Sequence, residues 1–344
     1  NTTGNNNTVM GHAAMNKNTS GCNNTASGYH ALCSNTTGKN NTAHGAWSLS
    51  KNTTGCRNAV FGQGAMEKNT TGCWNAAIGT RSLYSNTTAS FNVAVGGYAL
   101  TTNTTGTRNT AVGYNTMGLN VSGDWNTAMG FNAMYYNTGG CYNTAVGYCA
   151  LFDNSTACDN TGLGFYAATN TSTGHSNTAA GSCALLNNTT GCFNNAFGKR
   201  ALRSNTTGCF NVAAGNDALY GNTTGNSNTA SGYYALGKNT TGHSNAAIGH
   251  MAMTKNTTGH SNVAIGLQTM GCNTTAAYNT AVGTCAMFCN TGTGMAMEAF
   301  GFRALHSNTT GSCNTGIGFC ALYSNTSGCF NTASGYRSLA TNTT

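Results

Sequence analysis

Sixteen cysteines are the residues most able to do chemistry in this chain of 344 residues. Thiols bind metals, carry out redox reactions or cross-link a fold, and the first two uses commonly show a Cys-x-x-Cys pair. The sequence contains no such pair. Instead, eight of the cysteines form four pairs whose members are 17 positions apart: Cys56 with Cys73, Cys141 with Cys158, Cys192 with Cys209, and Cys272 with Cys289.

Asparagines in the acceptor pattern Asn-x-Ser/Thr recur at nearly the same spacing. This pattern is the signal for N-linked glycosylation. A simpler interpretation is that Asn-Thr-Thr-Gly is favourable turn chemistry, with threonine hydroxyls capping backbone groups. Sugars on threonines of the same loop are a further possibility. The predicted glycosylation sites are Asn1, Asn18, Asn35, Asn52, Asn69, Asn86, Asn103, Asn120, Asn154, Asn170, Asn188, Asn205, Asn222, Asn239, Asn256, Asn273, Asn308, Asn325 and Asn342.

Groups for acid–base or metal chemistry are scarce. Asp and Glu together number six, and no two of them share a repeat position that would pair their carboxylates. His243 and His260 are 17 positions apart, so a metal between them is conceivable, but the sequence offers no third ligand. No nucleophile elbow or phosphate-binding loop is present. We therefore expect no enzyme activity, no metal and no cofactor other than covalent glycans.

A repeat of 17 residues positions all these groups. Each copy reads Asn-Thr-Thr-Gly-x-x-Asn-Thr-Ala-Val-Gly-x-x-Ala-Leu-x-x, and positions are numbered below from its first asparagine. Twenty copies in phase account for the chain. Two irregularities are expected, namely a copy that begins one residue early at Asn170 and one residue inserted after Asn290. We find no linker, and we interpret residues 1–344 as a single repeat solenoid taken from a longer repeat protein.

The repeat predicts an all-β fold. Seventeen residues rich in Gly, Asn and Thr are too few for a helical hairpin repeat and favour helix poorly. We predict a β-solenoid (a β-helix or β-roll) of about 20 coils, each with two short strands. One copy cannot close a core alone, whereas stacked copies bury continuous columns. The large apolar residues at positions ten and fifteen are the predicted core, and the asparagines at position seven are predicted to form an amide ladder.

Stacking decides the chemistry of the cysteines. Equivalent residues in neighbouring coils lie about 4.7–4.9 Å apart, which falls within the Cα separation that disulfides require. We predict that at least two of the four cysteine pairs form disulfides. Such bonds imply an oxidising, extracellular setting.

Composition narrows the possible partners. Charged residues make up 6% of the chain, against about 25% in ordinary soluble domains, and the Lys and Arg residues are scattered. This argues against a nucleic-acid partner. No apolar run is long enough for a membrane-spanning helix. Position six often carries an aromatic residue, as in Trp74 with Phe91 and Phe193 with Phe210, and these could stack on each other or bind sugar rings.

Copies such as Asn109-Thr110-Ala111-Val112-Gly113-Tyr114 and Asn143-Thr144-Ala145-Val146-Gly147-Tyr148-Cys149-Ala150-Leu151 resemble a known repeat type. They are similar to the repeats of phage and giant-virus tail-fibre-like proteins and bacterial adhesin-like β-solenoids. The Ala-Val-Gly core is also similar to the head repeats of trimeric autotransporter adhesins. The resemblance covers the whole chain and implies a fibrous or adhesive surface protein.

We therefore expect a structural extracellular fibre or filament shaft, secreted or part of a surface appendage, and glycosylated along its Asn-Thr-Thr column. The expected partner is the chain itself, assembling into a fibre or filament, with a carbohydrate or cell-surface partner possible. The alternative function is an adhesin or another surface-binding solenoid. Ice binding is a weaker alternative, because the threonine pair is adjacent in a turn rather than spaced as Thr-x-Thr on a strand.

Overall fold

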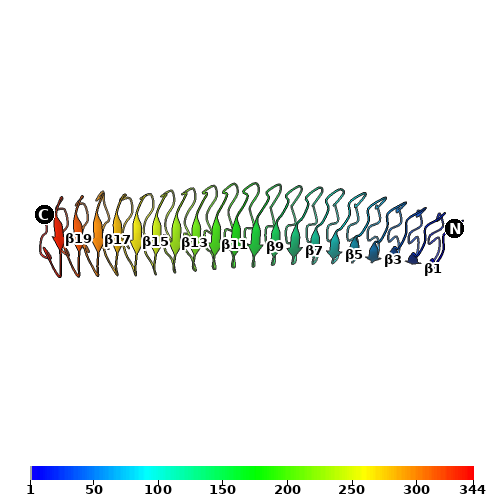
Figure 1. Cartoon of the computed structure of the whole chain (residues 1–344), viewed down its shortest axis with the longest axis horizontal. Coiled ribbons are helices and arrows are strands. Elements are labelled where there is room, and N and C mark those ends of the chain that lie inside the picture. The colour runs from blue at the N-terminus through cyan, green and yellow to red at the C-terminus, as the bar shows by residue number, and fades with distance from the viewer. Residues whose placement is uncertain (1) are drawn as a thin grey trace. The chain divides into compact units, whose positions relative to one another are not determined.

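The computed structural model describes residues 2–344 and divides into two compact units, Asn1–Thr173 and Gly174–Thr344. Each unit is a stack of coils with one three-residue strand per coil (Figure 1). The first unit holds β1 (Thr8–Met10), β2 (Thr25–Ser27), β3 (Thr42–His44), β4 (Ala59–Phe61), β5 (Ala76–Ile78), β6 (Val93–Val95), β7 (Thr110–Val112), β8 (Thr127–Met129), β9 (Thr144–Val146) and β10 (Thr161–Leu163). The second holds β11 (Thr178–Ala180), β12 (Asn195–Phe197), β13 (Val212–Ala214), β14 (Thr229–Ser231), β15 (Ala246–Ile248), β16 (Val263–Ile265), β17 (Thr280–Val282), β18 (Glu298–Phe300), β19 (Thr315–Ile317) and β20 (Thr332–Ser334).

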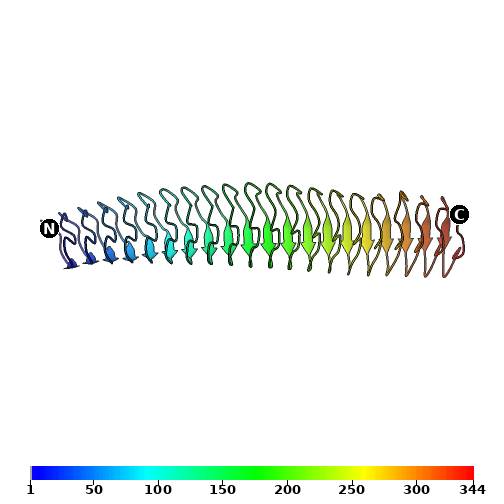
Figure 2. The same ribbon diagram turned by 180° about the vertical axis from the view of Figure 1, so that it is seen from behind.

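Within each unit, neighbouring strands pair in parallel and in register, so that equivalent residues of successive coils lie side by side (Figure 2). Ala94 of β6, for example, pairs with Ala111 of β7, which pairs in turn with Ala128 of β8. The residues described contain no helix. The prediction of an all-β solenoid with about twenty coils is therefore confirmed.

One of the two expected irregularities is present and the other is wrong. Ala281 of β17 pairs with Ala299 of β18, a step of 18 residues that contains the insertion after Asn290. No copy begins early at Asn170. Thr171 instead occupies position one, because its amide donates to the carbonyl of Ala168 just as the amide of Asn154 donates to that of Leu151, and because Thr171 is fully buried. Asn170 is the last residue of the preceding coil.

Each coil has one strand, so the prediction of two was wrong. The segment from position twelve to position seventeen forms turns, because the residues at positions thirteen and fifteen have left-handed backbones, as Arg81 (φ 54°) and Leu83 (φ 48°) show. A strand requires negative φ at every residue. Position eleven is also constrained: Gly79 has φ 127°, and a Cβ there would lie 2.6 Å from the backbone of Gly96 in the next coil.

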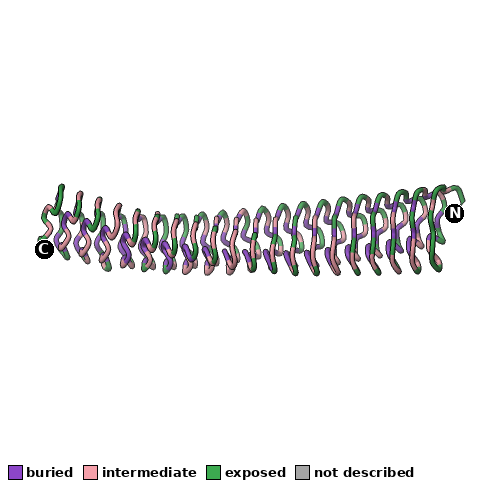
Figure 3. Tube along the Cα trace, turned by 90° about the horizontal axis from the view of Figure 1, so that it is seen from below, coloured by how far each residue is buried: buried purple, intermediate pink, exposed green. Residues whose placement is uncertain are grey.

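The core of each coil is formed by the residues at positions nine, fourteen and fifteen. Ala77, Ala99 and Leu83 are completely buried, and burying a leucine contributes about 1.5–3 kcal/mol. The prediction that position ten belongs to the core was wrong. Position nine points inward, so position ten points outward, and Ile78 is 44% exposed. Figure 3 shows the buried residues in purple along equivalent parts of successive coils.

Candidate functional surface

The asparagines at position one, predicted as glycosylation sites, form a buried ladder. The Nδ2 atom of Asn52 donates to Oδ1 of Asn35 one coil earlier (2.9 Å) and to the carbonyl oxygen of Gly55 in its own turn (3.0 Å). Asn69 repeats the pattern on Asn52 at 2.7 Å. This ladder was not predicted, although the recurrence of Asn at position one was itself a signal for it.

The ladder disagrees with glycosylation of this column, because an N-linked sugar attaches to the Nδ2 atom that is buried and hydrogen-bonded here. A glycan on any buried member would require its coil to open. Two predicted sites are only partly buried, Asn170 at position seventeen and Asn342, while Asn1 lies outside the residues described. The buried predicted sites are Asn18, Asn35, Asn52, Asn69, Asn86, Asn103, Asn120, Asn154, Asn188, Asn205, Asn222, Asn239, Asn256, Asn273, Asn308 and Asn325.

The amide ladder predicted at position seven is confirmed. Nδ2 of Asn41 donates to Oδ1 of Asn24 (3.2 Å), and the backbone amide of Asn41 donates to the same oxygen (2.9 Å). Nδ2 of Asn41 also reaches the carbonyl oxygen of Gly55 (2.8 Å), which is the acceptor used by Asn52. The two ladders therefore meet at the carbonyl of position four.

The turn chemistry of Asn-Thr-Thr-Gly is present as well. The hydroxyl of Thr36 donates to the carbonyl oxygen of Thr53 in the next coil (3.0 Å), and the backbone amide of Thr36 reaches the same oxygen (2.9 Å). The threonine at position three is different, since Thr37 and Thr54 are exposed. Position three therefore carries the accessible hydroxyl of this turn.

The predicted cysteine pairs occupy adjacent coils, but residues 2–344 contain no disulfide. Sγ of Cys56 lies 2.9 Å from Sγ of Cys73, so these thiols are in direct contact. Burial, together with the hydrogen bond from Cys56, raises the pKa of the Cys73 thiol. Disulfide formation stays a prediction for this pair and for Cys141 with Cys158, Cys192 with Cys209, and Cys272 with Cys289.

Position five also has a structural role that the sequence did not reveal. The backbone amide of Cys56 donates to Sγ of Cys73 (3.0 Å), and the amide of Cys73 donates to Oγ of Ser90 (2.9 Å). The amide of Cys209 likewise donates to Oδ1 of Asn226 (2.7 Å). Side chains at this position therefore act as acceptors for the amide of the preceding coil, which explains why Cys, Ser and Asn alternate there.

Two histidines at position five also stack. The rings of His243 and His260 lie 4.7 Å apart with an interplanar angle of 7°. In the part of the chain that the structure describes, no three His, Cys, Asp or Glu side chains are grouped so as to bind a metal ion. None of the helices that a membrane span would require is found there either.

The aromatic residues at position six stack on each other as predicted. Trp74 and Phe91 lie 6.5 Å apart at 11°, and Phe193 and Phe210 lie 5.1 Å apart at 5°. A third ring between two stacked rings would need about 7 Å, twice the contact distance of carbon atoms. These pairs therefore have no room for a sugar between their rings.

A second aromatic column, at position twelve, was missed. Tyr114, Phe131, Tyr148 and Phe165 stack in succession with centroid separations of 5.4–5.7 Å, and each is 43–51% exposed. They lie on the same outward face as the apolar residues of position ten. The signal was available in the sequence, because outward positions alternate along a strand.

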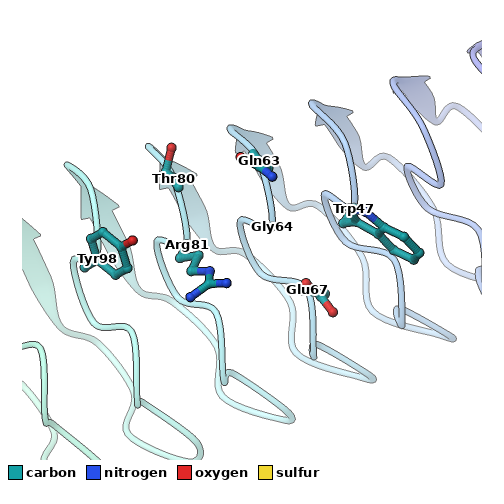
Figure 4. A pocket seen from close by; sticks show the side chains of 7 residues that line it. All are labelled: Trp47, Gln63, Gly64, Glu67, Thr80, Arg81 and Tyr98. Carbon is teal, nitrogen blue, oxygen red and sulfur yellow. The ribbon is translucent and has the colours of Figure 1, made fainter.

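The largest cavity of the first unit interrupts the column at position thirteen. It has a volume of about 460 Å³ and is lined by Trp47, Gln63, Gly64, Glu67, Thr80, Arg81 and Tyr98. Figure 4 shows Trp47, Gly64, Arg81 and Tyr98 on four successive coils, with Gln63 and Thr80 on one side of Gly64 and Glu67 on the other. We call this cavity the Gly64 notch.

Comparisons with known proteins leave the family open. No protein-family model matches the chain, and no curated protein matches it significantly.

Proposed function

We propose that this chain is a structural section of an extracellular fibre or filament shaft rather than an enzyme. The observation that supports this most strongly is the pair of buried asparagine ladders. They join each coil to the next through side-chain hydrogen bonds in addition to the backbone pairing. Buried amides that are fully paired stabilise and rigidify a fold. Mechanical continuity from coil to coil is the property that a shaft needs.

Self-association into a fibre is part of this proposal. An outward row of apolar residues at positions ten and twelve, which includes Phe131 (44% exposed) and Met129 (49%), supports it. Contiguous apolar surface of this kind marks interaction sites on soluble proteins. The low charge of the chain also leaves little electrostatic repulsion between copies.

Immunogold electron microscopy of the source cells or particles tests the shaft function. Antibodies raised against the purified chain should label a fibrous surface structure along its length. Label confined to the cell interior, or to the tip of an appendage alone, would contradict a shaft and an extracellular location.

A surface-binding role, as in an adhesin, is the second candidate, and the exposed aromatic column at position twelve favours it. Flow cytometry of cells incubated with fluorescent chain tests this role. Binding should fall when Phe131 and Tyr148 are both replaced by serine. Unchanged binding would exclude this column as the adhesive surface.

A further inference from the structure

The missing side chain at position 64 is not explained by backbone conformation. Gly64 has φ 61°, which is a left-handed conformation that usually favours glycine. Yet Trp47 (φ 63°) and Arg81 (φ 54°) hold the same position in the neighbouring coils with large side chains. A Cβ on Gly64 would also meet only ordinary contacts, the nearest being Glu67 Oε2 at 3.5 Å. The effect of glycine here is therefore to leave space.

The space has an aromatic wall on one side. The indole of Trp47 stacks on the imidazole of His30 at 4.5 Å and 13°, so one face of Trp47 is covered. Its other face is directed to the coil of Gly64, where no side chain continues the stack, and Trp47 is 40% exposed. An aromatic face that borders a cavity can stack on a flat ring.

The opposite wall is Arg81, whose guanidinium lies 5.5 Å from the ring centroid of Tyr84. Trp47 and Arg81 are two coils apart, a distance of roughly 9.5 Å at the usual strand spacing. One flat ring in contact with both walls needs about 7 Å, so the notch has the width for a single ring.

Polar groups surround the place of this ring. Glu67 lies beside Gly64, and Gln63, Thr80 and Tyr98 complete the lining. Within the described chain, the side chains of Glu67, Gln63 and Arg81 have no hydrogen bond or ion pair, since the ion pair found there joins Arg200 to Asp217. Their donors and acceptors are available to a ligand. One carboxylate and one guanidinium balance in charge, which suits a neutral ligand.

We propose that the Gly64 notch binds one neutral pyranose residue of a glycan. The apolar C–H face of the sugar stacks on Trp47, while its hydroxyl groups donate to Glu67 and accept from Arg81 and Gln63. A nucleobase would also fit between an indole and a guanidinium. The many hydrogen-bonding side chains around the edge favour a ring that carries a hydroxyl on most of its carbons. This site does not depend on a shaft function, so a failed sugar assay leaves that proposal standing.

Saturation-transfer-difference NMR on the purified full chain tests the site. The probes are the methyl pyranosides of mannose, glucose, galactose and N-acetylglucosamine, with adenosine as the competing class. At least one glycoside should bind, with the millimolar Kd typical of so small a ligand, and its ring C–H protons should receive the strongest saturation.

The variant Gly64→Tyr fills the notch and should weaken this binding by at least about tenfold, as expected for the loss of a ring-stacking contact. Glu67→Gln should weaken it severalfold. The matched control is Asn115→Tyr, which adds the same side chain in the same column, where the backbone is also left-handed (φ 55°). It should leave the Kd unchanged, and circular dichroism should show all three variants folded. Binding of no glycoside, binding that Gly64→Tyr leaves intact, or binding of adenosine alone would overturn the proposal.

Discussion

Asn52 donates a hydrogen bond of 2.9 Å from its side-chain amide to the side-chain oxygen of Asn35, the equivalent residue of the preceding coil. Both residues are completely buried. An acceptor motif for glycosylation is thus used, in the folded chain, as an internal ladder. The ladder is interrupted where the repeat is irregular: the buried hydroxyl of Thr171 and the side-chain oxygen of Asn290 have no partner.

Replacing Asn52 with alanine should destabilise its coil. The change removes the donor to Asn35 and the acceptor for Asn69, and each buried group left unpaired costs about 1–3 kcal/mol. Hydrogen exchange of the amides of Thr53 and Gly55 should accelerate by about thirtyfold or more, since each 1.4 kcal/mol is tenfold. The control Thr54→Ala destroys the same Asn-x-Thr motif but alters an exposed residue, and should leave exchange nearly unchanged. Equal effects of the two changes would contradict the ladder.

Glycopeptide mass spectrometry of the native protein should find the buried asparagines of position one without sugar. Their Nδ2 atoms are hydrogen-bonded inside the coil, as for Asn120 with Asn103 (2.8 Å). Sugars attached to the exposed threonines at position three, such as Thr54, would fit the fold. N-glycans on Asn52 or Asn120 would show that this column is open in the native protein.

The columns of the fold were readable from the sequence because each position repeats its residue type and therefore its environment. The glycine of position eleven, the leucine of position fifteen and the asparagine of position seven were placed correctly in this way. The direction of position ten was not, because three consecutive small or apolar residues, such as Ala76, Ala77 and Ile78, do not show which of them points inward. Asn170 misled the register because Asn170-Thr171-Ser172 imitates the start of a copy.

The candidate sites were less readable than the fold. Asn-x-Thr has the same sequence whether the asparagine is a sugar acceptor or a buried ladder, and burial alone separates the two. The Gly64 notch was also invisible, because Gly64 stands at a variable position of the repeat. Its meaning depends on the left-handed backbones of Trp47 and Arg81, which are properties of the structure.

Under oxidising conditions, Cys56 and Cys73 should form a disulfide, because their sulfur atoms are already in contact at 2.9 Å. Peptide mapping without reducing agent should recover the two linked peptides after exposure to oxidised glutathione. The variant Cys73→Ser should fold normally, since Ser90 accepts the equivalent backbone hydrogen bond in the next coil, and should leave Cys56 free. Recovery of Cys56 as a free thiol in the oxidised wild type would refute the pairing.

The second unit should lose stability in mild acid, in part through His306. Burial lowers the pKa of His306 below its usual 6.5, with a further contribution from Arg303, so the unfolded chain binds the proton more tightly than the folded one. The stability linked to this residue is therefore complete above pH 6.5 and is lost as the pH falls below it.

The variant His306→Phe removes this titration and keeps a ring between Phe288 and Tyr323. Thermal unfolding followed between about pH 7 and pH 5, across the usual pKa of histidine, should show a smaller fall in Tm for the variant than for the wild type. Parallel curves would show that His306 titrates alike in both states.

The central claim is that one coil of 17 residues stacks in register on the next, with like residues side by side. X-ray diffraction from an aligned sample of the purified chain tests this most directly. The account predicts a strong reflection at about 4.7–4.9 Å along the stacking direction. A pattern without this spacing, together with a circular dichroism spectrum dominated by helix, would contradict it.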